Sequence, residues 1–138
     1  MWLYNGVEFT SEMIEGYVGF VYIITNKTNE KKYVGKKIFK STKKLAPLKG
    51  KARRRTKVVE SDWKNYYGSS DEVKNLVEET GHDNFKREIL HLCKSKGEMG
   101  YLELKEQVDR EVLLRDDFYN GILSCKIHRN HVRSLKKS

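Results

Sequence analysis

The pattern of apolar and polar positions along this chain of 138 residues predicts a β-hairpin in its N-terminal third. Val18–Thr25 and Lys32–Phe39 are rich in β-branched and aromatic residues, and the polar, turn-prone Asn26–Glu30 separates them. Two such runs joined by a short polar connection are typical of antiparallel strands. Before them, Asn5-Gly6 is a turn signal, and Thr10–Ile14 indicates a short capped helix.

A helix is predicted after the polar segment that follows residue 60. Asp71–Thr80 carries apolar residues at helical spacing. Ser69 or Ser70 can cap its first turn, and Gly81 is a good residue to end it. The preceding stretch, DWKNYYGSS, is expected to be an ordered loop.

The rest of the chain predicts one more strand and one more helix. Phe85–Cys93 partly alternates and indicates a third strand, Gly97–Arg115 a longer helix, and Phe118–Ile127 an extended segment. Three strands with helices on their faces predict an α+β domain, with a small three-stranded antiparallel sheet flanked by helices. We expect residues 1–138 to form this single domain.

The net charge of +9 is concentrated in one segment. Of the 28 lysines and arginines, nine lie in Lys40–Lys57, which contains no acidic residue, and the remaining 19 equal the 19 acidic residues. A basic run in an otherwise neutral protein indicates contact with a polyanion. The alternative is a solvated loop, and in both cases we expect a basic insertion that interrupts regular structure. A short basic tail, KIHRNHVRSLKKS, is a second candidate for phosphate contact.

The composition gives no sign of secretion or of a membrane anchor. No apolar run approaches the roughly eighteen residues that a spanning helix needs. The N-terminal MWLYNGVEFTSEMIEG lacks the features of a signal peptide. Cys93 and Cys125 are therefore expected to be reduced thiols, and the protein to be cytoplasmic without a membrane partner.

Two tyrosine triplets on the predicted hairpin resemble a known family. Phe20-Val21-Tyr22 followed by Tyr33-Val34-Gly35 resembles the signature of the GIY-YIG nuclease superfamily, although Phe20 and Val21 depart from the first triplet. The segments YYGSSDEVKNLVEETGHDNFKREIL, KGEMGYLELKEQ and FYNGI resemble later parts of phage homing-endonuclease, Seg-like members. The resemblance covers roughly residues 17 to 127 and implies a Mg²⁺-dependent DNA endonuclease with a compact α/β core.

The resemblance also implies roles for five residues. Tyr33 would help to activate the attacking water, and Tyr22 would lie beside the scissile phosphate. Glu103 would bind the metal, Lys36 would lie near the phosphate, and Asn120 would have a structural or supporting role. We group these five as the candidate catalytic residues.

An arginine that the family usually carries is missing from its place. About ten residues after the glycine of the second triplet, this chain has Leu45. Either the role moves to one of the three arginines at 53–55, or Lys36 or Lys37 replaces it. A lysine lacks the bidentate fork of a guanidinium, so the replacement would have consequences.

The chemistry can be argued from the residue types alone. Mg²⁺ (or Mn²⁺) takes oxygen ligands and retains water, so one carboxylate such as Glu103 with phosphate oxygens can hold it. A tyrosine has an ordinary pKa of about 10, and the lysines around Tyr33 are expected to lower that value. Tyr22 and Tyr33 would be cross-strand neighbours if both project to the same face.

Several other residues have competing interpretations. Glu106 lies close to Glu103 on a helix and is the alternative metal ligand. Trp63, Tyr66 and Tyr67 either stack on nucleotides or anchor a loop. Histidines and cysteines near the C-terminal half offer a zinc site as an alternative, although the paired cysteine element that is usual in zinc sites is absent. These residues are His91, Cys93, Cys125, His128 and His131.

The favoured hypothesis is a Mg²⁺-dependent endonuclease that cleaves duplex DNA, phage-encoded, homing-like and acting in the bacterial host cell. Phosphate contacts would give affinity more than sequence information. One active site nicks a single strand, unless a homodimer forms on DNA. The alternative is a catalytically impaired nucleic-acid-binding regulator. The predicted DNA contacts are Lys37, Lys43, Lys44, Lys49, Lys51, Arg53, Arg54, Arg55 and Lys57.

Overall fold

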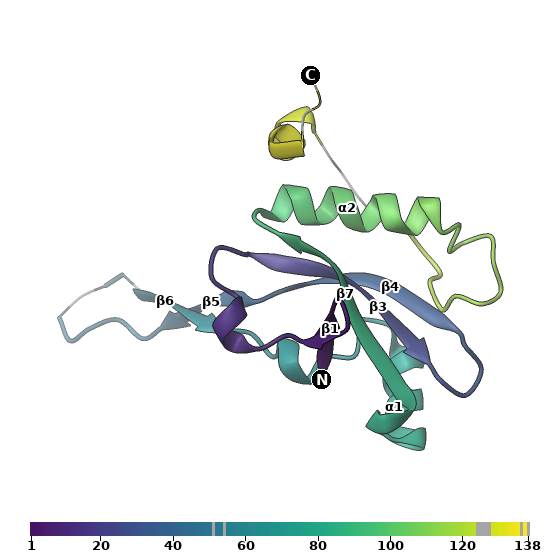
Figure 1. Ribbon diagram of the computed structural model, residues 1–138. Coiled ribbons are helices and arrows are strands. Elements are labelled where there is room, and N and C mark those ends of the chain that lie inside the picture. Colours follow the sequence, from purple (N-terminus) through teal and green to yellow (C-terminus); the bar gives the residue numbers. More distant parts are fainter. Residues whose placement is uncertain (51, 54, 124–127, 136, 138) are drawn as a thin grey trace.

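The computed structural model describes residues 1–138 except 51, 54, 124–127, 136 and 138. Three residues considered above, Lys51, Arg54 and Cys125, therefore lie outside the described residues. Figure 1 shows a central sheet with a helix on each side and a narrow ribbon that projects beyond the sheet.

The central sheet has five strands in the order β2-β1-β7-β3-β4. The strands are β1 Trp2–Tyr4, β2 Val7–Glu8, β3 Gly19–Asn26, β4 Lys32–Ile38 and β7 Phe85–Cys93. The predicted antiparallel three-stranded sheet is present as β7-β3-β4.

The expectation of only three strands was wrong, because an N-terminal hairpin adds two more. β1 runs parallel to β7 and antiparallel to β2, so the sheet is mixed. Strands of three and two residues are too short to show a period of two. The pairing of β1 depends on β7, which is distant in the sequence.

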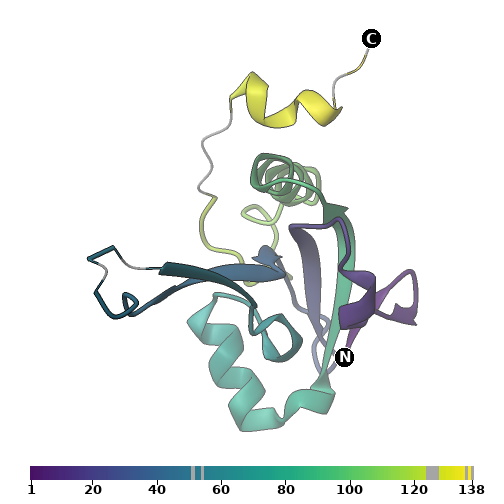
Figure 2. The same ribbon diagram turned by 90° about the vertical axis from the view of Figure 1, so that its left-hand side faces the viewer.

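A second correction concerns the basic segment. Its ends form a two-stranded antiparallel hairpin of β5 (Lys40–Leu45) and β6 (Arg55–Glu60), here called the arm. Figures 1 and 2 show that the arm projects away from the body of the domain. Most of the side chains of its strands are exposed and none is buried, so no apolar alternation marks these strands in the sequence.

Helices cover both faces of the sheet. α1 (Asp71–Thr80) begins at Ser70, whose side chain accepts a hydrogen bond from the Val73 amide, and is followed by Gly81 at φ 93°. α2 (Lys96–Asp109) is shorter than the predicted helix, because the chain leaves the helix at Arg110 and returns through a turn with Glu111 at φ 54°. In the described part of the chain, no helix is long and apolar enough to cross a membrane.

Short 3-10 turns complete the elements. They are η1 Ser11–Met13, η2 Trp63–Asn65, η3 His82–Asn84 and η4 Arg129–Leu135. η1 lies within the predicted short N-terminal helix, and η4 packs against α2 (Figure 1).

The strand β3 is buried along its whole length because it is central and covered on both faces. Phe20, Tyr22 and Ile24 point into the core beneath α1. Val21 and Ile23 point into the core beneath α2. A central strand of this kind reads as a continuous apolar run, which explains the strong signal in the sequence. The face of each residue on the β3–β4 hairpin follows from this alternation.

Candidate active site

The β3–β4 hairpin places its two tyrosines on the same face of the sheet. Tyr22 lies opposite Gly35, and Ile24 lies opposite Tyr33. The two tyrosines are therefore diagonal neighbours, with ring centroids 6.3 Å apart. The hairpin register that the sequence left open is settled by this pairing.

Two glycines make room for these rings. A Cβ atom at Gly35 would lie 2.6 Å from Cζ of Tyr22, which is far inside van der Waals contact. Gly68, at φ 93°, lies against the ring of Tyr33. The glycine of the second triplet is thus required by the close approach of the Tyr22 side chain.

The loop before α1 closes over the tyrosines. The Tyr33 and Ser69 hydroxyl oxygens are 2.8 Å apart and share a hydrogen bond. The Tyr66 ring meets the Tyr22 ring edge-on, with centroids 6.0 Å apart. Sequence reasoning did not assign Tyr66, Gly68 or Ser69 to the site, although YYGSS is the signal that could have done so.

Lys37 extends over the same loop. Its Nζ lies 4.2 Å from the centroid of the Tyr66 ring and 2.6 Å from Oδ1 of Asp62. Side chains on a strand alternate between its two faces, so Lys37 shares a face with Tyr33, four residues before it, while Lys36 points to the opposite face.

Arg87 anchors this loop from β7. Its Nη1 donates to the carbonyl oxygens of Lys64 and Tyr66, at 2.9 and 2.8 Å. The guanidinium stacks on the Trp2 and Tyr67 rings, and burial lowers its pKa. Its Nε has no hydrogen-bond partner among the described residues. Sequence reasoning missed this residue, since a lone arginine on a strand carries no signal of its own.

The aromatic loop is therefore held by buried contacts. Trp63 is only 1% exposed, and its indole Nε1 donates to Glu60 at 2.7 Å. Of the two interpretations of this loop, anchoring describes Trp63, which is buried in the core, and Tyr67, which is half-buried against it.

Burial raises the pKa of both tyrosines, and for Tyr33 this direction is opposite to our expectation. Burial, followed by the charge and hydrogen-bonding influence of Tyr66, raises the pKa of Tyr22 well above its ordinary value. Burial also raises the pKa of Tyr33, and the hydrogen bond with Ser69 opposes that shift only in part. The prediction that nearby lysines lower the pKa of Tyr33 was wrong, since desolvation of the phenol has the larger effect.

Lys36 and Glu103 meet on the α2 side of β4. Lys36 Nζ lies 3.8 Å from Oε1 of Glu103, whose side chain is 15% exposed. Burial raises the pKa of the Glu103 carboxyl, and the charge of Lys36 opposes this. The negative charge of Glu103 also raises the pKa of Tyr22 and Tyr33. Because β4 is the edge strand, its two faces meet at this edge, and Glu103 lies within electrostatic reach of both tyrosines.

The side chains at this edge fit a magnesium ion that is bound by a single protein carboxylate. No group of three or more potential metal-ligating side chains occurs within the described ranges. Glu103 is a carboxylate paired only loosely with Lys36, and Mg²⁺ commonly binds one carboxylate while water and phosphate oxygens fill its other positions. Glu103 therefore fits a metal that is held jointly with substrate.

Glu106 is already engaged elsewhere. Its carboxylate accepts hydrogen bonds from His91 Nε2 and Arg110 Nε, both at 2.8 Å. Burial alone would raise its pKa, but these hydrogen bonds lower it below the ordinary value. The geometry favours Glu103 over Glu106 as a metal ligand.

Asn120 is buried and holds the backbone of β4 next to Tyr33. Its Oδ1 accepts from the Val34 amide at 3.0 Å, and its Nδ2 donates to the Val34 carbonyl at 2.8 Å. Gln107 donates to the same carbonyl at 3.1 Å. The Asn120 amide binds the backbone between Tyr33 and Gly35, which fits the structural or supporting role that the resemblance implies. Asn120 thereby provides hydrogen-bond partners for the amide and carbonyl of Val34 at the free edge of β4.

The structure does not bring Arg53 or Arg55 to the tyrosines, and Arg54 lies outside the described residues. Arg55 begins β6, and Arg53 lies in the connection near the end of the arm, which points away from the sheet (Figure 1). Of the basic residues that the sequence proposed for the arginine's role and that the structure describes, Lys36 and Lys37 lie beside the candidate site. Lys43, Lys44, Lys49 and Lys57 lie on the arm with Arg53 and Arg55.

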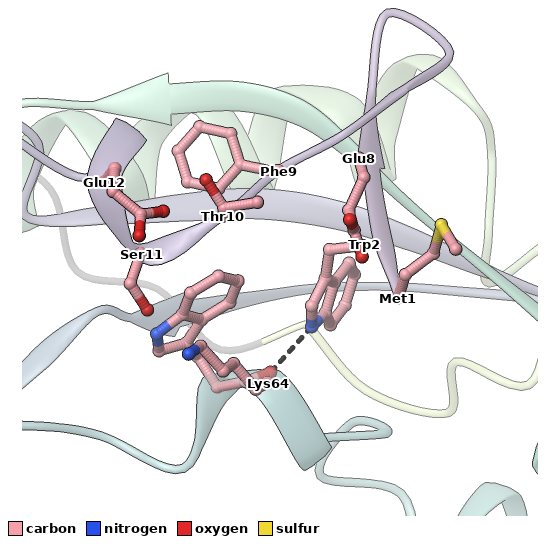
Figure 3. Close-up of a pocket in the computed structure, with 9 residues that line it drawn as sticks. Met1, Trp2, Glu8, Phe9, Thr10, Ser11, Glu12 and Lys64 are labelled. Carbon is pink, nitrogen blue, oxygen red and sulfur yellow. Dashed lines mark hydrogen bonds between the residues drawn. The ribbon is translucent and has the colours of Figure 1, made fainter.

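Two other features lie apart from this site. Figure 3 shows a hollow of about 260 Å³ beside the N-terminal hairpin, lined by residues 8–12 and by Trp63 and Lys64 among others, without a candidate catalytic residue. Of the residues considered for zinc, His91 binds Glu106, and Cys93 is buried with its pKa raised by burial to about 12.

Comparison with known protein families identifies the family of this chain. A family model described as "Putative endonuclease segE, GIY-YIG domain" matches residues 2–123. No curated protein and no solved structure matches the chain. The family match runs from β1 to beyond Asn120 and so includes both strands of the tyrosine hairpin and all of α2. The chain therefore belongs to the SegE family of GIY-YIG endonuclease domains, which makes it a nuclease.

Proposed function

We propose that this nuclease is a Mg²⁺-dependent endonuclease that hydrolyses phosphodiester bonds in duplex DNA. We further propose that it is phage-encoded, homing-like and active in the cytoplasm of the bacterial host, with Mn²⁺ able to replace Mg²⁺. The observation that carries the proposal is the meeting of Lys36 and Glu103 at the edge of β4 that also bears Tyr33.

The residues of this edge divide the work of binding and orientation. The Lys36 ammonium is partly exposed and would bind a phosphate oxygen. Glu103 would hold the metal, which when bound neutralises phosphate charge and lowers the pKa of its water. The raised pKa of Tyr33 keeps its phenol protonated at neutral pH in the free protein. Ser69 fixes the direction of that hydroxyl, which would orient the attacking water.

Tyr22 and Asn120 support this arrangement. Tyr22 is 1% exposed and packs between Gly35 and the ring of Tyr66, so it shapes the floor beneath Tyr33. Asn120 holds the Val34 backbone. We propose both as positioning residues.

The test is cleavage of supercoiled plasmid DNA with Mg²⁺ or Mn²⁺. We expect Glu103→Gln to lose at least about 100-fold in rate, the range for loss of one electrostatic stabiliser. Tyr33→Phe should also lose activity. Asp109→Asn, which removes an exposed carboxylate from the same helix, should cleave like the wild type.

Two outcomes would overturn parts of the proposal. Undiminished cleavage by Glu103→Gln would refute the metal assignment. A wild type that binds duplex DNA but cleaves it with neither ion would refute the duplex endonuclease activity and favour a binding regulator. A single protomer carries one such site, so nicks at low enzyme concentration and linear product at high concentration would indicate a homodimer on DNA.

A further inference from the structure

The arm has two chemically different faces. In its register, Lys43 lies opposite Lys57 and Leu45 opposite Arg55, while Lys44 lies opposite Thr56. Because side chains alternate along a strand, three cations share one face, here called the cationic face. It consists of Lys43, Arg55 and Lys57.

The cationic face lacks acidic partners in the folded chain. Lys43 and Lys57 are directly paired across the strands, and like charges in that position destabilise a hairpin. All three side chains are exposed, and no ion pair in the described part of the chain includes any of them. This repulsion between like charges is not offset by any burial of apolar core in the arm. It therefore indicates that the cationic face binds a polyanionic ligand.

The base of the arm is fixed to the strand that carries the candidate site. Phe39, which joins β4 to β5, is fully buried. Ser61, directly after β6, donates through its amide to the Phe39 carbonyl at 2.7 Å and through Oγ to the Ile38 carbonyl at 2.6 Å. The arm therefore leaves the body of the domain in a direction set by β4.

This connection limits the distance between the candidate site and the cationic face. Lys43 follows Lys36 by seven residues, and an extended chain rises by about 3.3 Å per residue, so the two lie at most about 23 Å apart. Duplex DNA rises by about 3.4 Å per base pair, so this reach corresponds to about seven base pairs. A two-stranded ribbon also fits the major groove, which is about 12 Å wide.

We propose that the cationic face binds the phosphate backbone of duplex DNA on one side of the cleaved bond, with its Lys43–Lys57 pair within about seven base pairs of that bond. This inference rests on the proposed function and deepens it. The arm makes the enzyme dependent on duplex DNA on that side of the cut and not on the other.

Binding tests the contact without requiring catalysis. Fluorescence anisotropy would measure the affinity of the triple variant Lys43→Gln/Arg55→Gln/Lys57→Gln for a labelled duplex. A matched control, Lys94→Gln/Lys96→Gln/Lys105→Gln, removes the same charge from exposed positions outside the arm. Three lost phosphate contacts lower the salt slope by about 2.7, so the affinity of the variant should fall roughly 40-fold less than that of the wild type between about 50 and 200 mM salt.

Trimming the substrate tests the direction. After the position of a nick in plasmid DNA has been mapped, duplexes shortened from either end are cleaved by wild type and triple variant. With the wild type, shortening one flank below about seven base pairs should reduce cleavage at least tenfold, while equal shortening of the other flank should not. The triple variant should show no difference between the flanks.

The outcomes separate the two proposals. Any one of three outcomes would overturn the role of the arm. The triple variant could show the salt dependence of the wild type, or the control variant could lose as much salt dependence as the triple variant. Cleavage by the wild type could also be equally sensitive to shortening of either flank. Arm-dependent binding without cleavage would overturn the proposed activity and leave the contact in place. Thermal unfolding checks that each variant is folded, and because the arm lies outside both cores, we expect unchanged midpoints.

Discussion

The hydrogen bonds around Val34 give the sharpest prediction. Val34 is fully buried, and its amide donates to Asn120, while its carbonyl accepts from both Asn120 and Gln107. Asn120→Ala leaves the buried amide without a partner, at a cost of about 2–3 kcal/mol. Gln107→Ala leaves the carbonyl bound to Asn120, so its cost should be about 1 kcal/mol.

The double variant distinguishes this reasoning from a simple count of bonds. With both side chains truncated, the Val34 carbonyl loses its last side-chain partner, so the combined cost should exceed the sum by about 1 kcal/mol. Urea unfolding followed by tryptophan fluorescence measures all four free energies. Strictly additive costs, or a cost of less than about 0.5 kcal/mol for Asn120→Ala, would refute the reasoning.

Asn120→Asp adds a test by pH. Its second carboxyl oxygen would face the Val34 carbonyl, so only the protonated acid can donate there. Folding should therefore raise the pKa of the new carboxyl above its unfolded value of about 3.9. The stability is then present below that value and is lost as pH rises through the folded pKa. A urea midpoint that stays parallel to that of the wild type between pH 4 and 7 would contradict this.

Three further predictions follow from the site. Gly35→Ala places a Cβ against the Tyr22 ring and should cost about 1–3 kcal/mol in urea unfolding; an unchanged midpoint would show that the ring can move aside. Glu103→Gln should raise stability at pH 7 while abolishing cleavage, because a carboxyl whose pKa is raised by folding destabilises the fold once pH exceeds its unfolded value. Equal stability of the two proteins at pH 7, or a difference in stability at pH 7 that does not shrink toward pH 4, would count against it. Arg87→Lys should cost about 2–3 kcal/mol, because a lysine cannot reproduce two hydrogen bonds and two ring contacts from a buried position; a loss below about 0.5 kcal/mol would contradict the anchoring role.

Local patterns in the sequence were sufficient for the elements whose own residues determine them. α1 was predicted with its observed bounds because its apolar spacing lies within it, and a serine cap and a glycine lie directly at its two ends. β7 likewise matches its predicted range, Phe85–Cys93. The β3–β4 hairpin was evident because a central strand is apolar on both faces.

Only the tertiary structure decided the features that depend on distant partners. The pairing of β1 with β7, the strands of the exposed arm and the early end of α2 have no local signature. The surroundings of the tyrosines were also beyond the sequence, because desolvation depends on what covers a side chain. Nearby lysines in the sequence suggested a lowered pKa for Tyr33, whereas its burial raises it.

The sequence by itself singled out Tyr22, Tyr33, Gly35 and Glu103 as candidates, because the short segments that contain them resemble motifs of the GIY-YIG family. The fold decided what they face: Gly35 opposite Tyr22, Lys36 beside Glu103, and Asn120 bound to the Val34 backbone. Spacing along a strand fixes which side a residue points to, but only packing fixes what it meets there.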